Sequence, residues 1–260
     1  KLRGWNLFNL NASNMLIYSP CIATDFCDFS SLSFSLKELQ NSTDQKYIQT
    51  QQFIYAYGIA YAMKYLHSIN IIHRDLKNDN IYLKRDPKFS NKYLVPIVAD
   101  FGLSKYSTDL LQSVNCGTAD YMAPELFLNK FNPEYKSPVD VYSYGIILSN
   151  IFLKADAPFF RKDLSKYRIP QYVQGGGRPN ITNCTEPQKE LLNKIWAQKD
   201  SDRLTFCEIV DYFQNPVENQ FVFDDFDKDV ILSYKKYIDN QLLISQKAKS
   251  DNLIRGTNNN

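Results

Sequence analysis

The chain has 260 residues, of which 44% are hydrophobic and 22% charged, and its formal net charge is +2. Such a chain can bury a substantial core, and its near-neutral charge gives no general electrostatic reason to bind nucleic acid or acidic membranes. No apolar stretch reaches the roughly twenty residues of a membrane span, and the N-terminus lacks a signal-peptide run. We therefore expect a globular, cytoplasmic protein with no nucleic-acid or membrane partner.

The cysteines agree with that compartment. They are odd in number and scattered, and neither they nor the two histidines form close ligand pairs of zinc-site type. We predict free thiols at Cys21, Cys27, Cys116, Cys184 and Cys207.

The predicted elements begin with strands and continue with a long helix. Residues 16–26 alternate between apolar and short polar side chains, which predicts strands and a turn in an edge or partial sheet, because Pro20 disfavours a central strand. Residues 47–67 carry apolar side chains at helical spacing. Residues 81–83 and 97–99 are short strand-like runs around a polar insert, residues 84–92, which predicts a hairpin loop.

The second half of the chain is predicted to be helical. Residues 139–153 are apolar on nearly every side, as expected of a helix at the centre of a helical domain, and residues 186–196 and 205–213 predict further helices. The glycines at 175–177 mark a turn between helices, since a phosphate loop would need a strand before it. Residues 228–244 predict an amphipathic helix packed on the helical lobe, and the polar residues after Ser245 are expected to be mobile.

Three motifs point to chemistry. HRDLKNDN occupies residues 73–80, DFG occupies residues 100–102, and GTADYMAPE occupies residues 117–125. Their order and spacing resemble those of the protein kinase family. DLKxxN and the Gly-Thr pair resemble the serine/threonine type, whereas YMAPE, VDVYSYG and Trp196 look most like the tyrosine-kinase-like group. The resemblance implies an α+β, protein-kinase-like fold, mainly the α-helical C-terminal lobe with a remnant of the N-terminal lobe sheet and hinge.

The resemblance assigns the catalytic residues. Phosphoryl transfer needs a carboxylate near the attacking hydroxyl, and Asp75 matches the catalytic-loop base. Asn80 and Asp100 match the two positions that bind Mg²⁺, which bridges the phosphates of ATP. Lys77 is placed to neutralise charge on the transferred group, and Thr118 is implied to hydrogen-bond both Lys77 and Asp75.

Residues at the regulatory and structural positions of the kinase family also resemble the family pattern. Arg74 resembles the buried arginine of kinases that are switched by activation-loop phosphorylation, and the candidate acceptors are Ser107, Thr108 and Ser113. The alternative is that these hydroxyls belong to an ordinary solvated loop. Structural roles are implied for Glu125 with Arg203, as a buried ion pair, and for Asp140, as the anchor of the catalytic-loop backbone. Leu204 follows Arg203 where the family usually has proline.

The residues that would bind the nucleotide resemble the family pattern less completely. Residues 22–27 resemble the strand and hinge that bind adenine, with Thr24, Asp25 and Cys27 as binding residues and Thr24 at the position that gates the back pocket. Tyr82 stands where the family usually has a smaller apolar residue beneath adenine, so its ring either stacks on the base or belongs to the core.

The family's Gly-rich loop, strand lysine and helix glutamate are not found before the hinge, and Gly4 is the only glycine before Gly58. We expect three segments: remnant N-lobe strands and hinge in residues 1–36, the C-lobe with catalytic loop and activation segment in 37–215, and a C-terminal helix with a mobile tail in 216–260.

Two interpretations of that absence remain. In the first, the chain is a truncated serine/threonine kinase domain that uses ATP and Mg²⁺ on a protein substrate, and it is weak or inactive alone. In the second, it is a non-catalytic binding module or scaffold. Retention of the whole catalytic set favours the first. Exposed hinge strands would also attract a partner that covers them.

Overall fold

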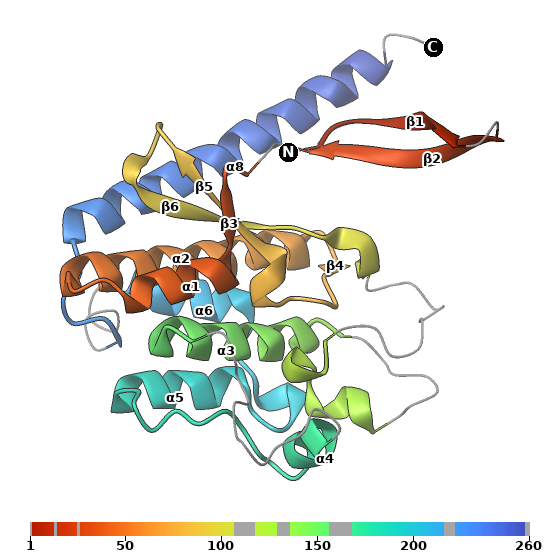
Figure 1. Cartoon of the computed structure of the whole chain (residues 1–260). Helices are drawn as coiled ribbons and strands as arrows, with labels where there is room; N and C mark the ends of the chain where they lie inside the picture. The colour runs from red at the N-terminus through yellow and green to blue at the C-terminus, as the bar shows by residue number, and fades with distance from the viewer. Residues whose placement is uncertain are drawn as a thin grey trace.

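A computed structural model of the chain describes residues 2–12, 15–24, 27–106, 118–128, 136–155, 168–215 and 222–257. Stacked helices form the body, a small antiparallel sheet stands above them, and a long C-terminal helix crosses the top (Figure 1). The predicted α+β class, mainly helical with a small remnant of sheet, is confirmed.

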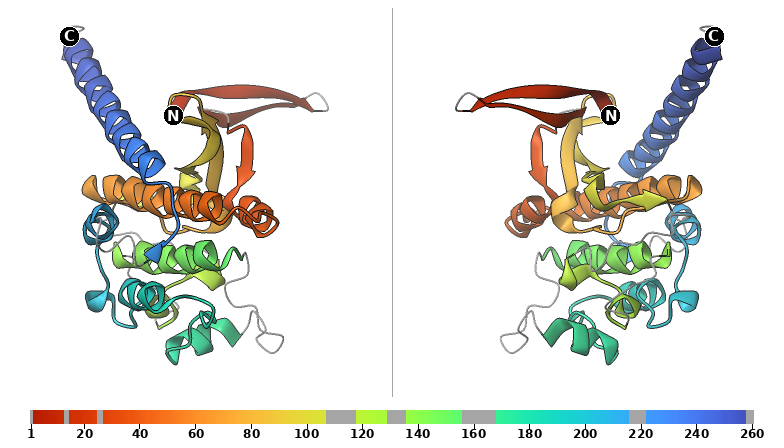
Figure 2. Two further views of the ribbon diagram at one scale, coloured as in Figure 1. Left: turned by 90° about the vertical axis from the view of Figure 1, so that its left-hand side faces the viewer. Right: turned by 90° about the vertical axis from the view of Figure 1, so that its right-hand side faces the viewer.

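The first two strands form a hairpin. Strand β1 (Leu2–Ala12) pairs antiparallel with β2 (Met15–Thr24), and each has only the other as a strand partner among the described residues. Pro20 lies in β2 opposite Leu7, and such a position is tolerated because a two-stranded ribbon consists of edges. The hairpin projects from the top of the molecule, away from the helices (Figure 2). The alternation in residues 16–26 predicted β2 and missed β1.

A second sheet has the order β3-β5-β6. It comprises β3 (Phe29–Ser31), β5 (Ile81–Asp86) and β6 (Ser90–Val98). The hairpin between β5 and β6 was predicted, but its strands extend into the expected polar insert and only residues 87–89 connect them. Charged side chains fit these strands because one face of an antiparallel pair can meet solvent. A short pair, β4 (Ile71–Ile72) with β7 (Lys105–Tyr106), brackets the first two motifs.

The predicted helices lie close to their expected positions, and the structure also has α1 and α4, which were not predicted. They are α1 (Leu32–Gln40), α2 (Gln45–Ser68), α3 (Pro138–Leu153), α4 (Ile169–Gln174), α5 (Glu186–Ile195), α6 (Phe206–Gln214) and α8 (Lys228–Thr257). Asp44 caps the N-terminus of α2, because its carboxylate accepts from the Tyr47 backbone N–H at 2.9 Å. Capping boxes start α5 at Thr185 and α6 at Thr205. Helix α1 was not predicted, and it spans the expected boundary between residues 36 and 37, so the three-part division stays a prediction.

A buried amide joins the helical body to the sheet. Gln51 of α2 is fully buried; its Nε2 donates to the Leu94 carbonyl at 2.8 Å and its Oε1 accepts from the Leu94 N–H at 2.9 Å. Leu94 lies in β6, and these groups point away from β5, so the amide satisfies the outer edge of the strand as another strand would. The sheet is thereby held on α2.

The C-terminal helix α8 lies above α2 and beside the β5–β6 hairpin (Figures 1 and 2). It continues to Thr257, beyond the apolar spacing that predicted a helix over residues 228–244. The mobility expected for residues after Ser245 stays a prediction. Within the described ranges, every helix is too short or too polar to cross a bilayer.

Candidate active site

Residues 73–80 run from β4 to β5 as a loop fixed from below by one buried carboxylate. Asp140, near the start of α3, is 1% exposed. Its Oδ2 accepts from the His73 backbone N–H at 2.8 Å and its Oδ1 from the Arg74 N–H at 2.9 Å. His67, at the end of α2, places its Nε2 2.9 Å from Oδ2. Helices α2 and α3 therefore position the loop through Asp140, as the resemblance implied for this residue.

Arg74 has a left-handed backbone conformation, with φ of 72°, and its side chain is buried. This conformation is uncommon for a residue with a long side chain and persists only where the surroundings enforce it. The bond from its N–H to Asp140 provides that constraint. The strained residue directly precedes Asp75 and so helps to direct the Asp75 side chain.

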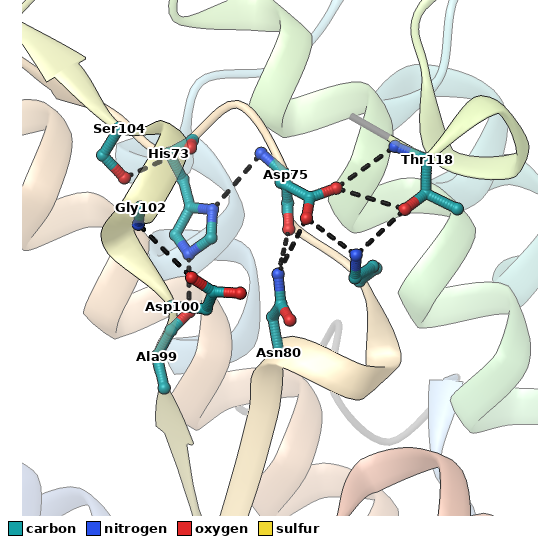
Figure 3. Close-up of polar contacts among 9 residues, drawn as sticks. His73, Asp75, Asn80, Ala99, Asp100, Gly102, Ser104 and Thr118 are labelled. Atoms are coloured by element: carbon teal, nitrogen blue, oxygen red, sulfur yellow. Dashed lines mark hydrogen bonds and ion pairs between the residues drawn. The ribbon is translucent and has the colours of Figure 1, made fainter. Parts of the chain in front are cut away.

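Asp75 is the centre of a polar network (Figure 3). Its Oδ2 accepts from Lys77 Nζ at 2.7 Å and from Asn80 Nδ2 at 3.1 Å. Its Oδ1 accepts from the backbone N–H of Thr118 at 3.1 Å and from the Thr118 hydroxyl at 3.2 Å. Lys77 also donates to Thr118 Oγ1 at 3.0 Å. The structure thus brings together Asp75, Lys77, Asn80 and Thr118, four residues named from the sequence.

The ring of His73 links this loop to the strand end that precedes Asp100. Its Nε2 lies 2.9 Å from the Ala99 carbonyl and its Nδ1 3.4 Å from the Asp75 N–H. Because the carbonyl can only accept and the N–H can only donate, Nε2 faces an acceptor and Nδ1 faces a donor. The Ala99 N–H in turn donates to the Asn80 carbonyl at 2.9 Å. Asn80 and Asp100 are thereby held at neighbouring strand ends.

Asp100 follows β6 and is exposed. Its φ of 61° is left-handed, and its Oδ1 accepts from the Gly102 N–H at 3.3 Å, so it caps the turn that follows. In Figure 3 it lies beside His73, on the side of Asp75 opposite Thr118. Ser104 closes the turn by donating to the His73 carbonyl at 3.2 Å. Phe101 is 47% exposed.

The donor chemistry at these strand ends fits Mg²⁺. Asn80 turns its amide nitrogen toward Asp75, at 2.8 Å from the carbonyl, which leaves its Oδ1 as the atom that can face a cation. Asp100 supplies carboxylate oxygens, and hard oxygen ligands are those that Mg²⁺ prefers. Within the described part of the chain, no three His, Cys, Asp or Glu side chains group as a self-contained metal site. A magnesium ion here would depend on further oxygens, as in sites completed by nucleotide phosphates.

Glu125 and Arg203 form a bidentate ion pair away from the catalytic loop. Both N···O distances are 2.7 Å, and Arg203 donates further to the Pro138 carbonyl at 2.9 Å. The guanidinium lies 5.2 Å from the ring centroid of Tyr142, and burial raises the pKa of that phenol to about 12. Leu204 has a reason to replace proline, because its N–H donates to the Lys194 carbonyl at 3.2 Å.

The nucleotide-side residues are only partly described. Tyr82 lies in β5 opposite Ile97 and is 41% exposed, which disfavours the core-packing interpretation. Thr24 ends β2, and Cys27 is half-buried. Asp25, Ser107, Thr108 and Ser113 lie outside the described residues.

Sequence reasoning gave no role to two residues that support the catalytic loop. His67 contacts Asp140, and Ser33 donates to Asp79 Oδ1 at 2.7 Å. The available signal for His67 was that it is one of only two histidines, six residues before the other. The α1 residue Ser33 had no comparable signal, because its partner lies 46 positions away.

Comparison with known proteins shows that the chain is similar to protein kinases. A family model described as protein tyrosine and serine/threonine kinase matches residues 2–213. The RGS domain-containing serine/threonine-protein kinase A of Dictyostelium discoideum is 35% identical over 193 residues, which cover 74% of this chain and 16% of that protein. The probable serine/threonine-protein kinase drkD of the same organism is 32% identical over 195 residues, covering 74% of this chain and 14% of that protein.

A plant relative shows the same similarity. The serine/threonine-protein kinase STY17 of Arabidopsis thaliana is 35% identical over 163 residues, which cover 60% of this chain and 26% of that protein. The matched segment therefore spans only 14 to 26% of the length of these relatives.

Proposed function

Because the chain belongs to the protein tyrosine and serine/threonine kinase family, we propose that it is a serine/threonine kinase domain that transfers the γ-phosphoryl group of ATP to a hydroxyl of a protein substrate. The observation that carries the proposal is the contact set of Lys77, which donates to Asp75 at 2.7 Å and to Thr118 at 3.0 Å. It unites the DLKxxN motif with the Gly-Thr motif around one carboxylate.

The proposed mechanism assigns each side chain one task. Asp75 orients the substrate hydroxyl and accepts its proton, which requires a carboxylate that is ionised and held in place. Lys77 and Thr118 hold the carboxylate in place, because together they donate to both of its oxygens. Lys77 also offsets negative charge as the phosphoryl group transfers. Asn80 and Asp100 would hold Mg²⁺, which neutralises the charge of the nucleotide phosphates when bound.

Serine or threonine as the acceptor is favoured over tyrosine by two observations. The lysine two residues after the base matches the serine/threonine pattern, and Lys77 contacts the base directly. The three relatives described above are all named serine/threonine kinases. We further propose a cytoplasmic location, with a protein partner covering the exposed hinge strands.

Residues 1–260 alone are proposed to have little activity. The chain has no glycine between Gly4 and Gly58, so it carries no Gly-rich loop to cover the phosphates, and no lysine before residue 22 has the expected context. A positioned base contributes about 10²- to 10⁴-fold, whereas orienting both reactants contributes roughly 7 to 11 kcal/mol. The catalytic loop therefore retains the base, whereas much of the orienting machinery is not found in these 260 residues.

The first test is binding of Mg-ATP, measured as the shift in melting temperature of the purified chain. We expect a positive shift that disappears in Asp100→Asn and persists in Asp211→Asn, a matched substitution on the surface of α6. Equal shifts in the two variants would contradict a nucleotide site at Asp100, and no shift in any protein would favour the binding-module interpretation.

The second test is transfer of radiolabelled phosphate to serine, threonine and tyrosine peptides, made with residues 1–260 and with the complete product of the gene. We expect turnover far below the usual range of about 1 to 100 per second for the 260-residue chain. The complete product should label serine or threonine and lose that labelling in Asp75→Asn. Labelling of tyrosine alone, or activity that survives Asp75→Asn, would overturn the assignment.

A further inference from the structure

The β5–β6 hairpin carries both proposed metal ligands at its base. Asn80 directly precedes β5, and Asp100 lies two residues after the end of β6. The Ala99 N–H to Asn80 carbonyl bond continues the pairing between the two ends. Any contact that fixes this hairpin therefore also fixes the spacing and direction of Asn80 and Asp100.

The segment of residues 222–243, called here the strap, packs against the hairpin. Tyr237 donates its hydroxyl to Asp86 Oδ2 at 2.7 Å, next to the turn of the hairpin. The ring of Phe89, in that turn, lies 4.9 Å from the Tyr234 ring and 5.5 Å from the Tyr237 ring, centroid to centroid. Helix α8 runs beside the hairpin along this stretch (Figures 1 and 2).

The strap is also anchored on the helical body. Tyr61 of α2 donates to Asp239 Oδ1 at 2.7 Å, and the Asp227 N–H donates to Thr50 Oγ1 at 2.8 Å. Lys235 donates to the Phe213 carbonyl at the end of α6 at 2.9 Å. The strap thus connects α2 and α6 with the hairpin, so it can transmit the rigidity of the helices to the strands.

Shape complementarity fixes where the strap sits. The Tyr234 side chain is fully buried, and a Cβ built on Gly58 of α2 would lie 2.3 Å from its hydroxyl oxygen and 2.7 Å from Cγ of Pro96. Only glycine leaves room for this phenol between α2 and β6. The hydroxyl has no hydrogen-bond partner among the described residues, so packing rather than a hydrogen bond holds the ring.

The strap meets the DFG segment across one cavity. A cavity of about 440 Å³ is lined by α2, by β6 residues 95–98, by strap residues that include Ile238 and Leu242, and by Phe101. Phe101 is the neighbour of Asp100, and it is 47% exposed here. The strap and Phe101 therefore line the same cavity, so a displaced strap would change the surroundings of Phe101.

We propose that the strap is a positioning element for Asn80 and Asp100, holding the β5–β6 hairpin on one side and limiting the movement of Phe101 on the other. The inference rests on the proposed nucleotide site and adds to it a control that lies behind the site. Tyr234 is the positioning residue at its centre: it touches neither nucleotide nor metal and acts through the hairpin. Release of the strap would loosen both ends of the hairpin at once.

The test compares four proteins under conditions where all are folded: wild type, Tyr234→Ala, Tyr234→Phe and Leu192→Ala. Leu192 is buried in α5, far below the hairpin, and serves as a control for general destabilisation (Figure 1). Hydrogen exchange of the peptides that cover residues 79–103 should accelerate in Tyr234→Ala only, because Tyr234→Phe keeps the ring in its notch. Unchanged exchange in Tyr234→Ala, or equal acceleration in Leu192→Ala, would overturn the proposal.

Affinity for Mg-ATP supplies the second readout. We expect Tyr234→Ala to weaken it by at least about threefold, with wild-type affinity in Tyr234→Phe and Leu192→Ala. Unchanged affinity in Tyr234→Ala overturns the positioning role even where exchange accelerates. If wild type itself does not bind Mg-ATP, the proposed function fails, and hydrogen exchange alone then decides whether the strap fixes the hairpin.

Discussion

The two sides of the catalytic loop differ in how they are held. Below the loop, Asp140 is buried and accepts from two backbone N–H groups and from His67. Above it, Tyr82 is 41% exposed and Phe101 47% exposed. The base is thus positioned by contacts within the helical body, whereas the side chains that would face the nucleotide are exposed and are supported only from behind, where the strap packs against the hairpin.

The groups that hold the base and the groups that would orient ATP differ in the same way. The contacts that hold Asp75 come from its own loop and from Thr118, within the helical half of the molecule. Orientation of ATP requires groups on the opposite side of the cleft. A kinase domain can therefore keep a preorganised base and still lack turnover, and stability and activity should respond to different substitutions.

The largest effect is expected on the lower side, from Asp140→Ala. Removing the carboxylate leaves the His73 and Arg74 N–H groups buried without an acceptor, and each such group costs about 1 to 3 kcal/mol. We expect the free energy of unfolding to fall by about 3 kcal/mol in urea denaturation. Asp140→Asn keeps one carbonyl oxygen and should lose roughly half as much. A loss below about 0.5 kcal/mol for Asp140→Ala would show that the loop is held by other contacts.

The lower side is also where the sequence was most informative. The resemblance of the three motifs to those of protein kinases singled out Asp75, Lys77, Asn80 and Thr118, which the structure brings into one network. Local signals sufficed because loop residues 73–80 follow one another along the chain and because α3 is apolar on nearly every side. The fold class was predictable because the same motifs resemble those of the protein kinase family.

The features that could not be predicted from the sequence depend on contacts between residues that lie far apart in the chain. The Tyr234 phenol fits the notch at Gly58 although 176 positions separate them (234 minus 58), and neither residue carries a local signal of that contact. The strands β5 and β6 extend past their apolar runs because the ladder of backbone bonds, not side-chain polarity, sets their ends. Helix α1 was missed because its nine residues are too few for a clear helical period.

On the upper side, Tyr82→Leu should change nucleotide binding and leave the fold unchanged. The ring is 41% exposed, so its truncation removes little core packing. Aromatic stacking contributes about 0.5 to 1.5 kcal/mol beyond buried area, which predicts a weakening of Mg-ATP affinity of about two- to tenfold. Isothermal titration and urea denaturation of the same variant separate the two effects. Equal affinity with lowered stability would assign Tyr82 to the core instead.

The smallest effect concerns the strap at its contact with Asp86. Burial raises the pKa of this carboxyl, but hydrogen bonds from Tyr237, from the Lys88 N–H and from Lys84 outweigh it and hold the pKa below its usual value. A carboxyl with a lowered pKa in the folded state adds stability above its unfolded pKa of about 3.9, and that stability is lost as the pH falls through the folded-state pKa.

Tyr237→Phe removes one of the donors and so reduces the shift without removing the ring. We expect the variant to be less stable than wild type by about 1 kcal/mol at pH 7, the contribution of one hydrogen bond to a charged acceptor at a partly exposed site. Because protonated Asp86 is a poorer acceptor, the difference in free energy of unfolding should shrink as the pH falls below about 4. Urea denaturation of wild type and of Tyr237→Phe, from pH 7 to below about pH 4, measures this difference in the free energy of unfolding. A difference that stays constant into acid would mean that Tyr237 stabilises the strap through its ring alone, and would place the link between strap and hairpin at Tyr234.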